Sequence, residues 1–377
     1  MFPILALLQA VALPTPRPLG PATVVIPRDF VQIMAVAERR DGRLVVVDRG
    51  DELVAVVDLT ARSVTPIGRV GGGPGEYRFP GRLIPTATDS LILADDGNNR
   101  LQLLGPDGRF HRLVPRTTPG LPVELTPRVV GARGQVLAVI PGWVLFGEGQ
   151  PTDSLPIIRF TPGAAGRETV AKLKATPEPP PPPRRDRPRI PMMIFGAGDA
   201  WAATPSGRIA IVRAPDFRIE WIAPDGGRTV GPLIAWKPVP VAALDRTNFA
   251  RRFLATSGVG GKGGADRPPG SLTAVPADEM TDEAVAALVA NSPFATTKPP
   301  FTDATPIIAA DGTLWLERSV PAGKPAIWDL FDGAGRPVRS WELPAGRRLV
   351  AVGRSAVYLV ARDADDNERL ERYALPD

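Results

Sequence analysis

One short pattern of polar and apolar positions recurs along most of the chain. A turn containing Gly, Asp or Ser is followed by four to six apolar residues of types that favour β-strands. Copies of this pattern occur at residues 41–48, 88–95, 132–140, 206–213, 311–318 and 354–361. Apolar runs of this length between turn residues predict β-strands.

A second signal follows each of the first five copies. It is a strand with an apolar or aromatic residue and then a polar turn, at residues 56–64, 103–110, 158–164, 221–227 and 328–335. In the Pro-Asp-Gly turns at 106–108 and 224–226, proline fixes φ, aspartate bonds the local backbone and glycine accepts a positive φ. Each unit is therefore predicted to end in a β-hairpin.

The spacing of the copies predicts the fold. Two of the intervals are long, and each contains an insertion: a proline-rich segment at 177–191, expected to form an extended polyproline loop, and residues 236–300. With these insertions and residues 1–12 set aside, about 47 residues remain for each of six units. This length suits a four-stranded propeller blade. We predict an all-β, six-bladed β-propeller of antiparallel blades with a small helical insert.

The two ends of the chain predict how the ring closes. The sixth unit contains only three strands, at 349–352, 357–361 and 368–375, and residues 22–27 form an unassigned strand before the first unit. A ring leaves exposed strand edges unless one terminus completes its last blade. Residues 22–27 are therefore expected to supply the outer strand of the final blade, within one domain that spans 22–377.

The insertion at 236–300 has a helical period instead. Residues 241–255 place Leu244, Phe249, Phe253 and Leu254 on one side, and Thr281 precedes two acidic residues where a second helix over 284–290 is expected to begin. We expect this helical pair to lie over one end of the propeller and to cover part of its central channel. The alternative is that it packs against the side of the ring.

Residues 65–115 resemble a repeat of a known family. The glycine-rich run 70–80, the strand and turn at 91–100 and the turn at 106–110 resemble the NHL-type six-bladed propeller repeat. The chain looks like an exported bacterial member of the six-bladed group, which also contains TolB-like propellers. The resemblance implies the fold and leaves the activity open.

The composition excludes several kinds of metal and redox site and bears on nucleic-acid binding. The chain contains no cysteine, which excludes disulfides, iron–sulfur clusters and cysteine-bound zinc, and its one histidine, His111, excludes multi-histidine metal sites. The net charge is +5 with a pI near 9.8, but the arginines are dispersed among acids. Such a dispersed excess is typical of a solvated surface, so no nucleic-acid binding is expected.

Residues 1–12 are an apolar run that ends in Ala10-x-Ala12, although no lysine or arginine precedes it. The run suits a signal peptide and is too short for a membrane span. Export to the periplasm or outside the cell is therefore expected. The alternative is a buried N-terminal strand.

Five residues are the candidate ligand-binding positions: Glu76, Tyr77, Asp95, Asn99 and Arg100. The first two stand in the glycine-rich linker, where they could line the channel or simply connect two blades. Asp95 and Asn99, with their polar neighbours, could bind calcium, although the spacing is not that of an EF-hand and also suits the end of a strand. Arg100 is expected to bond nearby carbonyls or carboxylates.

Other conspicuous residues favour structural roles. His111 is expected on an outer strand, exposed to solvent. The tryptophans are expected to fill the wedges between neighbouring blades. These tryptophans are at positions 143, 201, 221, 315, 328 and 341.

The sequence leaves more than one function open. The preferred hypothesis is a non-enzymatic, exported, monomeric propeller that binds a protein, peptide or glycan at one face of the ring, without a cofactor. The alternative is a calcium-dependent hydrolase similar to the lactonase and gluconolactonase branches, which hold a metal with Glu, Asn and Asp. A TolB-like periplasmic scaffold is a third possibility. Converging acidic and amide side chains in the channel would favour the enzyme, and arginines would favour binding.

Overall fold

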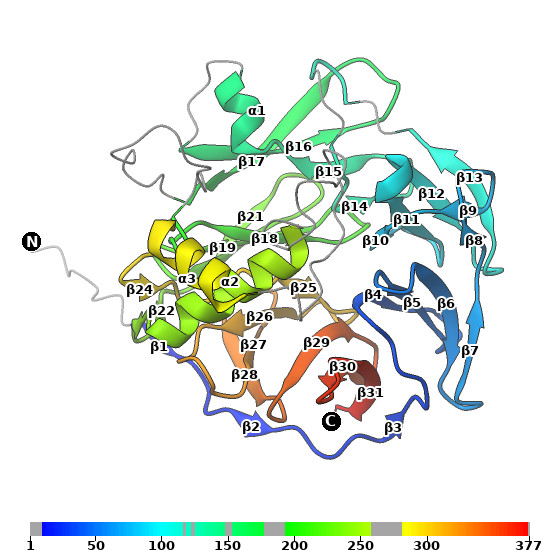
Figure 1. Cartoon of the computed structure of the whole chain (residues 1–377). Helices are drawn as coiled ribbons and strands as arrows, with labels where there is room; N and C mark the ends of the chain where they lie inside the picture. The colour runs from blue at the N-terminus through cyan, green and yellow to red at the C-terminus, as the bar shows by residue number, and fades with distance from the viewer. Residues whose placement is uncertain are drawn as a thin grey trace, which may run out of the picture.

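The computed structural model describes residues 10–115, 118–121, 125–147, 153–176, 193–257 and 281–375. Six antiparallel sheets stand around a common axis, each with its first strand innermost (Figure 1). This is the predicted six-bladed β-propeller. The predicted proline-rich loop at 177–191 lies outside the described residues.

The blades follow one another in chain order. Blade 1 contains β4 (Ile33–Glu38), β5 (Leu44–Asp48), β6 (Leu53–Asp58) and β7 (Ser63–Pro66), and blade 2 contains β10 (Pro80–Pro85), β11 (Leu91–Asp95), β12 (Arg100–Leu104) and β13 (Phe110–Val114). Blade 3 contains β14 (Val129–Val130), β15 (Val136–Val139), β16 (Ser154–Phe160) and β17 (Arg167–Lys174), and blade 4 contains β18 (Ala200–Ala203), β19 (Ile209–Arg213), β20 (Arg218–Ile222) and β21 (Arg228–Val230). Blade 5 contains β25 (Ile307–Ile308), β26 (Leu314–Arg318), β27 (Ile327–Phe331) and β28 (Pro337–Glu342), and blade 6 contains β29 (Arg347–Val352), β30 (Ala356–Arg362), β31 (Glu368–Ala374) and β3 (Val24–Val25). Two short strand pairs lie between blades: β8 (Arg69–Val70) with β9 (Glu76–Tyr77), and β23 (Val239–Pro240) with β24 (Thr297–Lys298). A turn of 3₁₀ helix, η1 (Asp96–Asn98), connects β11 to β12 within blade 2.

The N-terminal segment closes the ring as predicted. Strand β3 pairs antiparallel with β31, with Val24 opposite Arg372 and Val25 opposite Glu371. The preceding residues follow the outer rim, where β2 (Arg17–Pro18) pairs with β28 and β1 (Val11–Ala12) pairs with β22 (Ile234–Ala235) (Figure 1). Strand β1 contains the last two residues of the predicted leader, and removal of that leader stays a prediction.

The core is divided among the six interfaces between blades. Each interface holds its own cluster of buried apolar side chains, and one of these clusters joins blade 6 to blade 1. Trp201 packs between blades 3 and 4, and Trp221 between blades 4 and 5. Trp315, Trp328 and Trp341 pack between blades 5 and 6. The predicted wedge-filling role of these tryptophans is confirmed.

The Pro-Asp-Gly segments form the predicted hairpin turns. Gly108 and Gly226 adopt φ values of 76° and 91°, a region that side chains with a Cβ rarely occupy. The backbone N–H groups of Arg109 and Gly227 donate to the carboxylates of Asp107 and Asp225 at 3.1 and 2.9 Å. These local bonds connect the third and fourth strands of blades 2 and 4.

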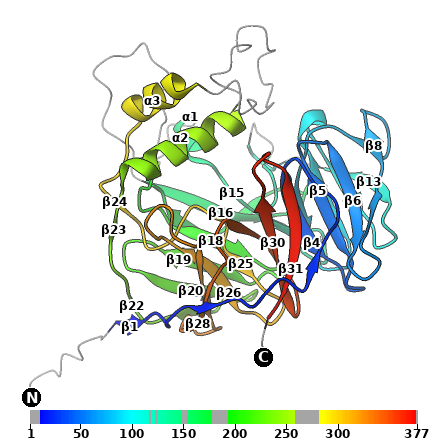
Figure 2. The same cartoon turned by 60° about the horizontal axis from the view of Figure 1, so that its bottom comes forward.

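One face of the ring carries the described helices. Strands alternate in direction, so the loop between the second and third strands of a blade leaves from the same face as the link to the next blade. Helix α1 (Gly142–Gly147) lies in the first kind of loop, and α2 (Ala243–Ser257) and α3 (Asp282–Asn291) lie in the link from blade 4 to blade 5. We call this side the helical face (Figure 2). Helix α1 was not predicted, and the side chain of Trp143 within it lies outside the described residues.

Helix α3 begins as predicted, because the Thr281 hydroxyl accepts a hydrogen bond from the Ala284 N–H at 3.1 Å. Helix α2 runs over blades 4 and 5 toward the middle of the ring (Figure 1). No helix in the described part of the chain has the length and apolar character needed to cross a bilayer.

The apolar side of α2 differs from the prediction. Leu254 packs against Val285 of α3, and the Phe249 ring lies 5.8 Å from that of Phe294. Leu244 is half exposed, so its predicted place on the buried side is wrong. The reason is that α2 has separate contacts with α3 and with the ring, and Leu244 in the first turn belongs to neither cluster.

Candidate functional site

Among the predicted site residues, Asp95 is fully buried at the end of β11. Its carboxylate accepts hydrogen bonds from the Arg78 N–H at 2.8 Å, Arg100 Nε at 2.7 Å and Gln102 Nε2 at 3.0 Å. Asn98 Nδ2 donates to both carboxylate oxygens, at 3.0 and 3.1 Å. A carboxylate has about four acceptor positions, so these groups fully occupy Asp95.

Arg100 and Glu76 hold the glycine-rich linker to blade 2. Arg100 donates to the carbonyls of Gly72, Gly73 and Glu76 at 2.8–3.0 Å, as the sequence predicted for its role. The Glu76 carboxylate accepts from the Gly73 N–H at 2.7 Å and from Arg69 Nε at 2.7 Å. These two donors, the backbone N–H first, lower the pKa of Glu76.

Tyr77 and Asn99 also serve the joint between blades 1 and 2. Tyr77 is buried, its hydroxyl accepts from the Val54 N–H at 3.0 Å, and burial raises its pKa. Asn99 adopts a left-handed φ of 48° where η1 ends, and its N–H donates to the Asp96 carbonyl at 3.2 Å. The five predicted residues therefore lie together at one joint, and the hydrogen bonds described above join them to other residues of the chain. Ligand binding there stays a prediction.

His111 lies on the outer strand β13, exposed, as predicted. Its Nε2 lies 2.8 Å from the Asp107 carboxylate, and this hydrogen bond is the main cause of the lowered pKa of Asp107. The pair is far from the axis of the ring.

A different set of residues meets on the inner wall of the ring. Arg128 immediately precedes β14, the innermost strand of blade 3, and its Nη1 donates to Thr305 Oγ1 at 3.2 Å. Thr305 lies just before β25 of blade 5. The bond therefore connects blade 3 to blade 5, the two blades on either side of blade 4. The guanidinium carbon lies 5.1 Å from the centre of the Trp201 ring on β18 of blade 4. Three blades thus contribute to one contact.

Arg82 brings a second positive charge to this wall. It is exposed and lies on β10, the innermost strand of blade 2, which neighbours β14. Burial, together with the charge of Arg82, lowers the pKa of Arg128 to about 10. Both guanidinium groups are charged at neutral pH. We call Arg82, Arg128, Trp201 and Thr305 the inner-wall site.

The loop that supplies Thr305 also contacts Glu317 of β26, a half-buried acid. The Thr302 N–H donates to the Glu317 carbonyl on β26 at 2.9 Å, and Arg252 of α2 and Asp303 lie close enough to act on the charge of the Glu317 carboxylate. Burial dominates and raises the pKa of Glu317. Perturbed ionisable groups of this kind gather at functional sites, although structural networks produce them too.

Glu317→Gln tests this environment. A raised folded-state pKa means that the folded protein holds the proton better, so the wild type loses stability as the pH rises from the ordinary value of 4.5 through the folded pKa. We expect the variant to gain stability relative to the wild type over that interval and to match it at lower pH. Thermal unfolding midpoints from acid to neutral pH measure this. The exposed Glu283→Gln on α3 is the control, and parallel curves for wild type and E317Q would contradict the expectation.

The inner-wall residues were missed because the sequence does not show which innermost strands face one another. The sequence feature that could have pointed to them is an arginine directly before apolar residues of an innermost strand. Arg82 precedes Leu83, and Arg128 precedes Val129. Only the ring order brings these positions together.

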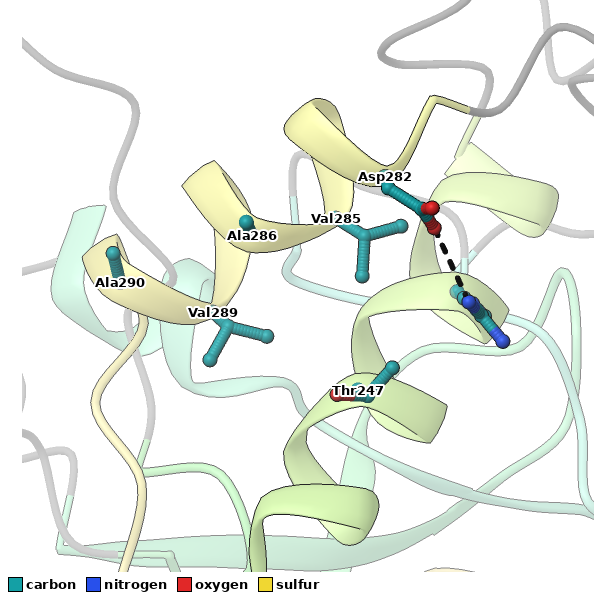
Figure 3. A pocket seen from close by; sticks show the side chains of 7 residues that line it. Thr247, Asp282, Val285, Ala286, Val289 and Ala290 are labelled. Carbon is teal, nitrogen blue, oxygen red and sulfur yellow. Dashed lines mark hydrogen bonds and ion pairs between the residues drawn. The ribbon is translucent and has the colours of Figure 1, made fainter.

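Two hollows lie on the helical face. One of about 350 Å³ lies between α2 and α3, where Val285 and Val289 point toward Thr247 and Arg251 pairs with Asp282 at 3.3 Å (Figure 3). The other, of about 540 Å³, is lined mainly by apolar groups, among them Phe195, Trp236 and Phe294. The helical face therefore contains concave surface that is partly apolar.

No group of three or more His, Cys, Asp or Glu residues in the described ranges is arranged to hold a metal ion. Asp95, the buried acid of the predicted oxygen-rich cluster, is occupied by Arg100 and its neighbours. Calcium binding remains open, because amide and carbonyl oxygens also bind this ion.

No family model and no curated protein sequence matches the chain. Solved structures do match it along nearly its whole length. A member of the DUF4221 family from Bacteroides vulgatus has 8% identity and a TM-score of 0.50, covering 96% of each chain. A gluconolactonase from Xanthomonas campestris has 12% identity and a TM-score of 0.43, covering 95% of this chain and 98% of that one. A calcium-binding regucalcin from Agrobacterium tumefaciens has 11% identity and a TM-score of 0.35, covering 97% and 98%. These likenesses concern the fold alone.

Proposed function

We propose that this protein is a non-enzymatic, exported propeller that acts as a monomer and binds a protein, peptide or glycan on its helical face. The observation that carries the proposal is the gathering of α1, α2 and α3 on one face of the ring. The opposite face carries short turns such as Gly131–Gln135. Concave, partly apolar surfaces are where proteins bind ligands.

The inner wall supports binding over hydrolysis. The inner-wall site places Arg82 and Arg128 beside Trp201, an arrangement that suits recognition of an acidic or polar ligand. The sequence hypothesis linked arginines in this place to binding and converging acids to a metal enzyme. The inner-wall site therefore favours the binding hypothesis.

The proposal also includes export of the protein and a relation to NHL-type or TolB-like propellers. The apolar run at 1–12 supports secretion or a periplasmic location, and the linker at 70–80 supports kinship with NHL-type or TolB-like binding propellers. The dispersed arginines, many of them in ion pairs, favour no nucleic-acid partner.

A calcium-dependent lactonase or hydrolase remains the alternative. It would need a calcium site built largely from amide and carbonyl oxygens or from residues outside the described ranges. A ligand that binds only the folded state raises the melting temperature. A clear rise on adding calcium, reversed by a chelator, would favour this alternative.

The absence of cysteine allows a direct test of the binding face. A single introduced cysteine can carry a bulky polyethylene glycol maleimide at a chosen place. Leu244→Cys puts this shield on α2 of the helical face, and Arg133→Cys puts it in the exposed turn between β14 and β15 on the opposite face. Binding of each labelled protein to peptide and glycan arrays is compared with that of the unlabelled variant.

We expect the shield at position 244 to abolish array binding and the shield at position 133 to leave it unchanged. Array ligands that are lost only with the shield at 133 would contradict the proposed face. An array without any bound ligand would contradict the proposed function itself.

A further inference from the structure

In the part of the chain that the structure describes, the inner-wall site contains a charge without a carboxylate counter-ion. Other arginines at the ring have carboxylate partners: Arg100 pairs with Asp95 at 2.7 Å, and Arg213 pairs with Asp199 at 2.6 Å. Arg348 pairs with Glu368 at 3.2 Å. Within the described ranges, no carboxylate oxygen lies within 4.0 Å of Arg82 or Arg128. Arg82 and Arg128 differ from Arg100, Arg213 and Arg348 in this respect.

This arrangement is costly for the unliganded protein. A charge removed from water is stabilised only by a counter-charge or by several hydrogen bonds. The charge that acts on Arg128 is instead the positive charge of Arg82, and its effect is unfavourable. An anion placed between the two guanidinium groups would remove both penalties at once.

The geometry around Arg128 leaves donors for such an anion. A guanidinium has five N–H donors, and the described bonds of this side chain use one of them, toward Thr305. The Trp201 ring packs against the guanidinium carbon and restricts its orientation. A guanidinium held in this way presents paired N–H groups, which match the oxygens of a carboxylate or phosphate.

We propose that Arg82 and Arg128 bind a dianionic oxygen group, either a phosphate or two neighbouring carboxylates, on the inner wall of the ring. Thr305 and Trp201 orient Arg128, and the exposed Arg82 meets the ligand first. This inference rests on the proposed function and names the chemical group that the ligand presents.

The test is isothermal titration calorimetry on the full chain in a chloride buffer of fixed ionic strength. Inorganic phosphate and glutarate are titrated separately, so that the two sources of the charge are distinguished. We expect saturable binding of at least one probe. Because a hydrogen bond to a charged group contributes about 1.5–3 kcal/mol, Arg128→Gln should weaken that binding about tenfold or more.

Two further variants keep the test decisive. Arg82→Gln changes an exposed side chain, so it is expected to fold normally and to weaken the same probe. Arg112→Gln removes an equal charge from the outer strand β13 and should leave binding within about twofold of the wild type. Without anion, Arg128→Gln should melt no lower than the wild type, because a half-buried charge beside Arg82 has been removed.

Binding of phosphate alone supports a phosphorylated ligand, and binding of glutarate alone supports an acidic one. Failure of both probes, or binding that survives Arg82→Gln and Arg128→Gln unchanged, would overturn the inference. The array experiment does not involve these arginines. Array binding blocked at position 244 with both probes inactive would reject this site and leave the proposed function standing.

Discussion

Replacement of Asp95 by alanine lowers the free energy of unfolding by about 3–5 kcal/mol, the cost typical of removing one partner from a buried ion pair. Asp95 is fully buried and joins Arg100, Gln102 and the Arg78 backbone, so its loss leaves several buried donors without an acceptor. The bonds link blade 2 to the linker from blade 1. The loss therefore weakens the ring as a whole, and chemical denaturation followed by fluorescence measures it.

Asp41→Ala is the matched control. Asp41 forms an exposed ion pair with Arg43 at 2.6 Å, and exposed pairs contribute little to stability. Its unfolding curve should nearly overlay that of the wild type. A D95A protein as stable as D41A would show that the joint between blades 1 and 2 does not depend on the carboxylate.

Lys298→Ala is expected to release the helical insert from the ring. Lys298 lies on β24, and its Nζ contacts Asp245 Oδ1 at 2.6 Å and the Val320 carbonyl at 2.6 Å. Asp245 is 6% exposed and also accepts from the Ala242 N–H at 2.9 Å, at the start of α2. Removal of the lysine leaves a buried carboxylate unpaired, at a cost of about 3–5 kcal/mol.

The effect should be concentrated in α2 and α3, because this pair anchors the insert and lies outside the cores between blades. Hydrogen exchange of α2 peptides should accelerate strongly, while peptides of blades 1 and 2 keep their protection. Arg251→Ala removes the exposed pair with Asp282 and serves as the control, with little change expected. Unchanged exchange in α2 of the K298A protein would be inconsistent with this anchoring role.

Local chemistry explains why the fold could be predicted. The turn at Asp107-Gly108 and the cap at Thr281 act through neighbouring residues, so their effects are visible in the sequence itself. The blade length then predicts the ring, and the three-stranded sixth unit predicts the closing strand. Helix α1 lacked such signals: it is short and follows β15 without a polar cap.

The candidate site could not be predicted in the same way. Arg128 and Thr305 are 177 residues apart, and only ring closure brings them together across blade 4. The sequence instead drew attention to Asp95 and Arg100, whose motif marks a joint between two blades. Buried ionic residues that hold a fold together and those that bind a ligand look alike in a single sequence. Their partners in space distinguish them.

The central claim is that Arg128, at the inner wall, has no carboxylate partner among the described residues and binds an anion together with Arg82. A crystal structure of the full chain, grown in chloride and then soaked with phosphate or glutarate, tests it most directly. The account predicts that no carboxylate oxygen of the protein lies within salt-bridge distance of Arg128, and that the soaked anion lies between Arg82 and Arg128. A carboxylate from any part of the chain paired with Arg128, with no anion at the inner wall after soaking, would contradict it.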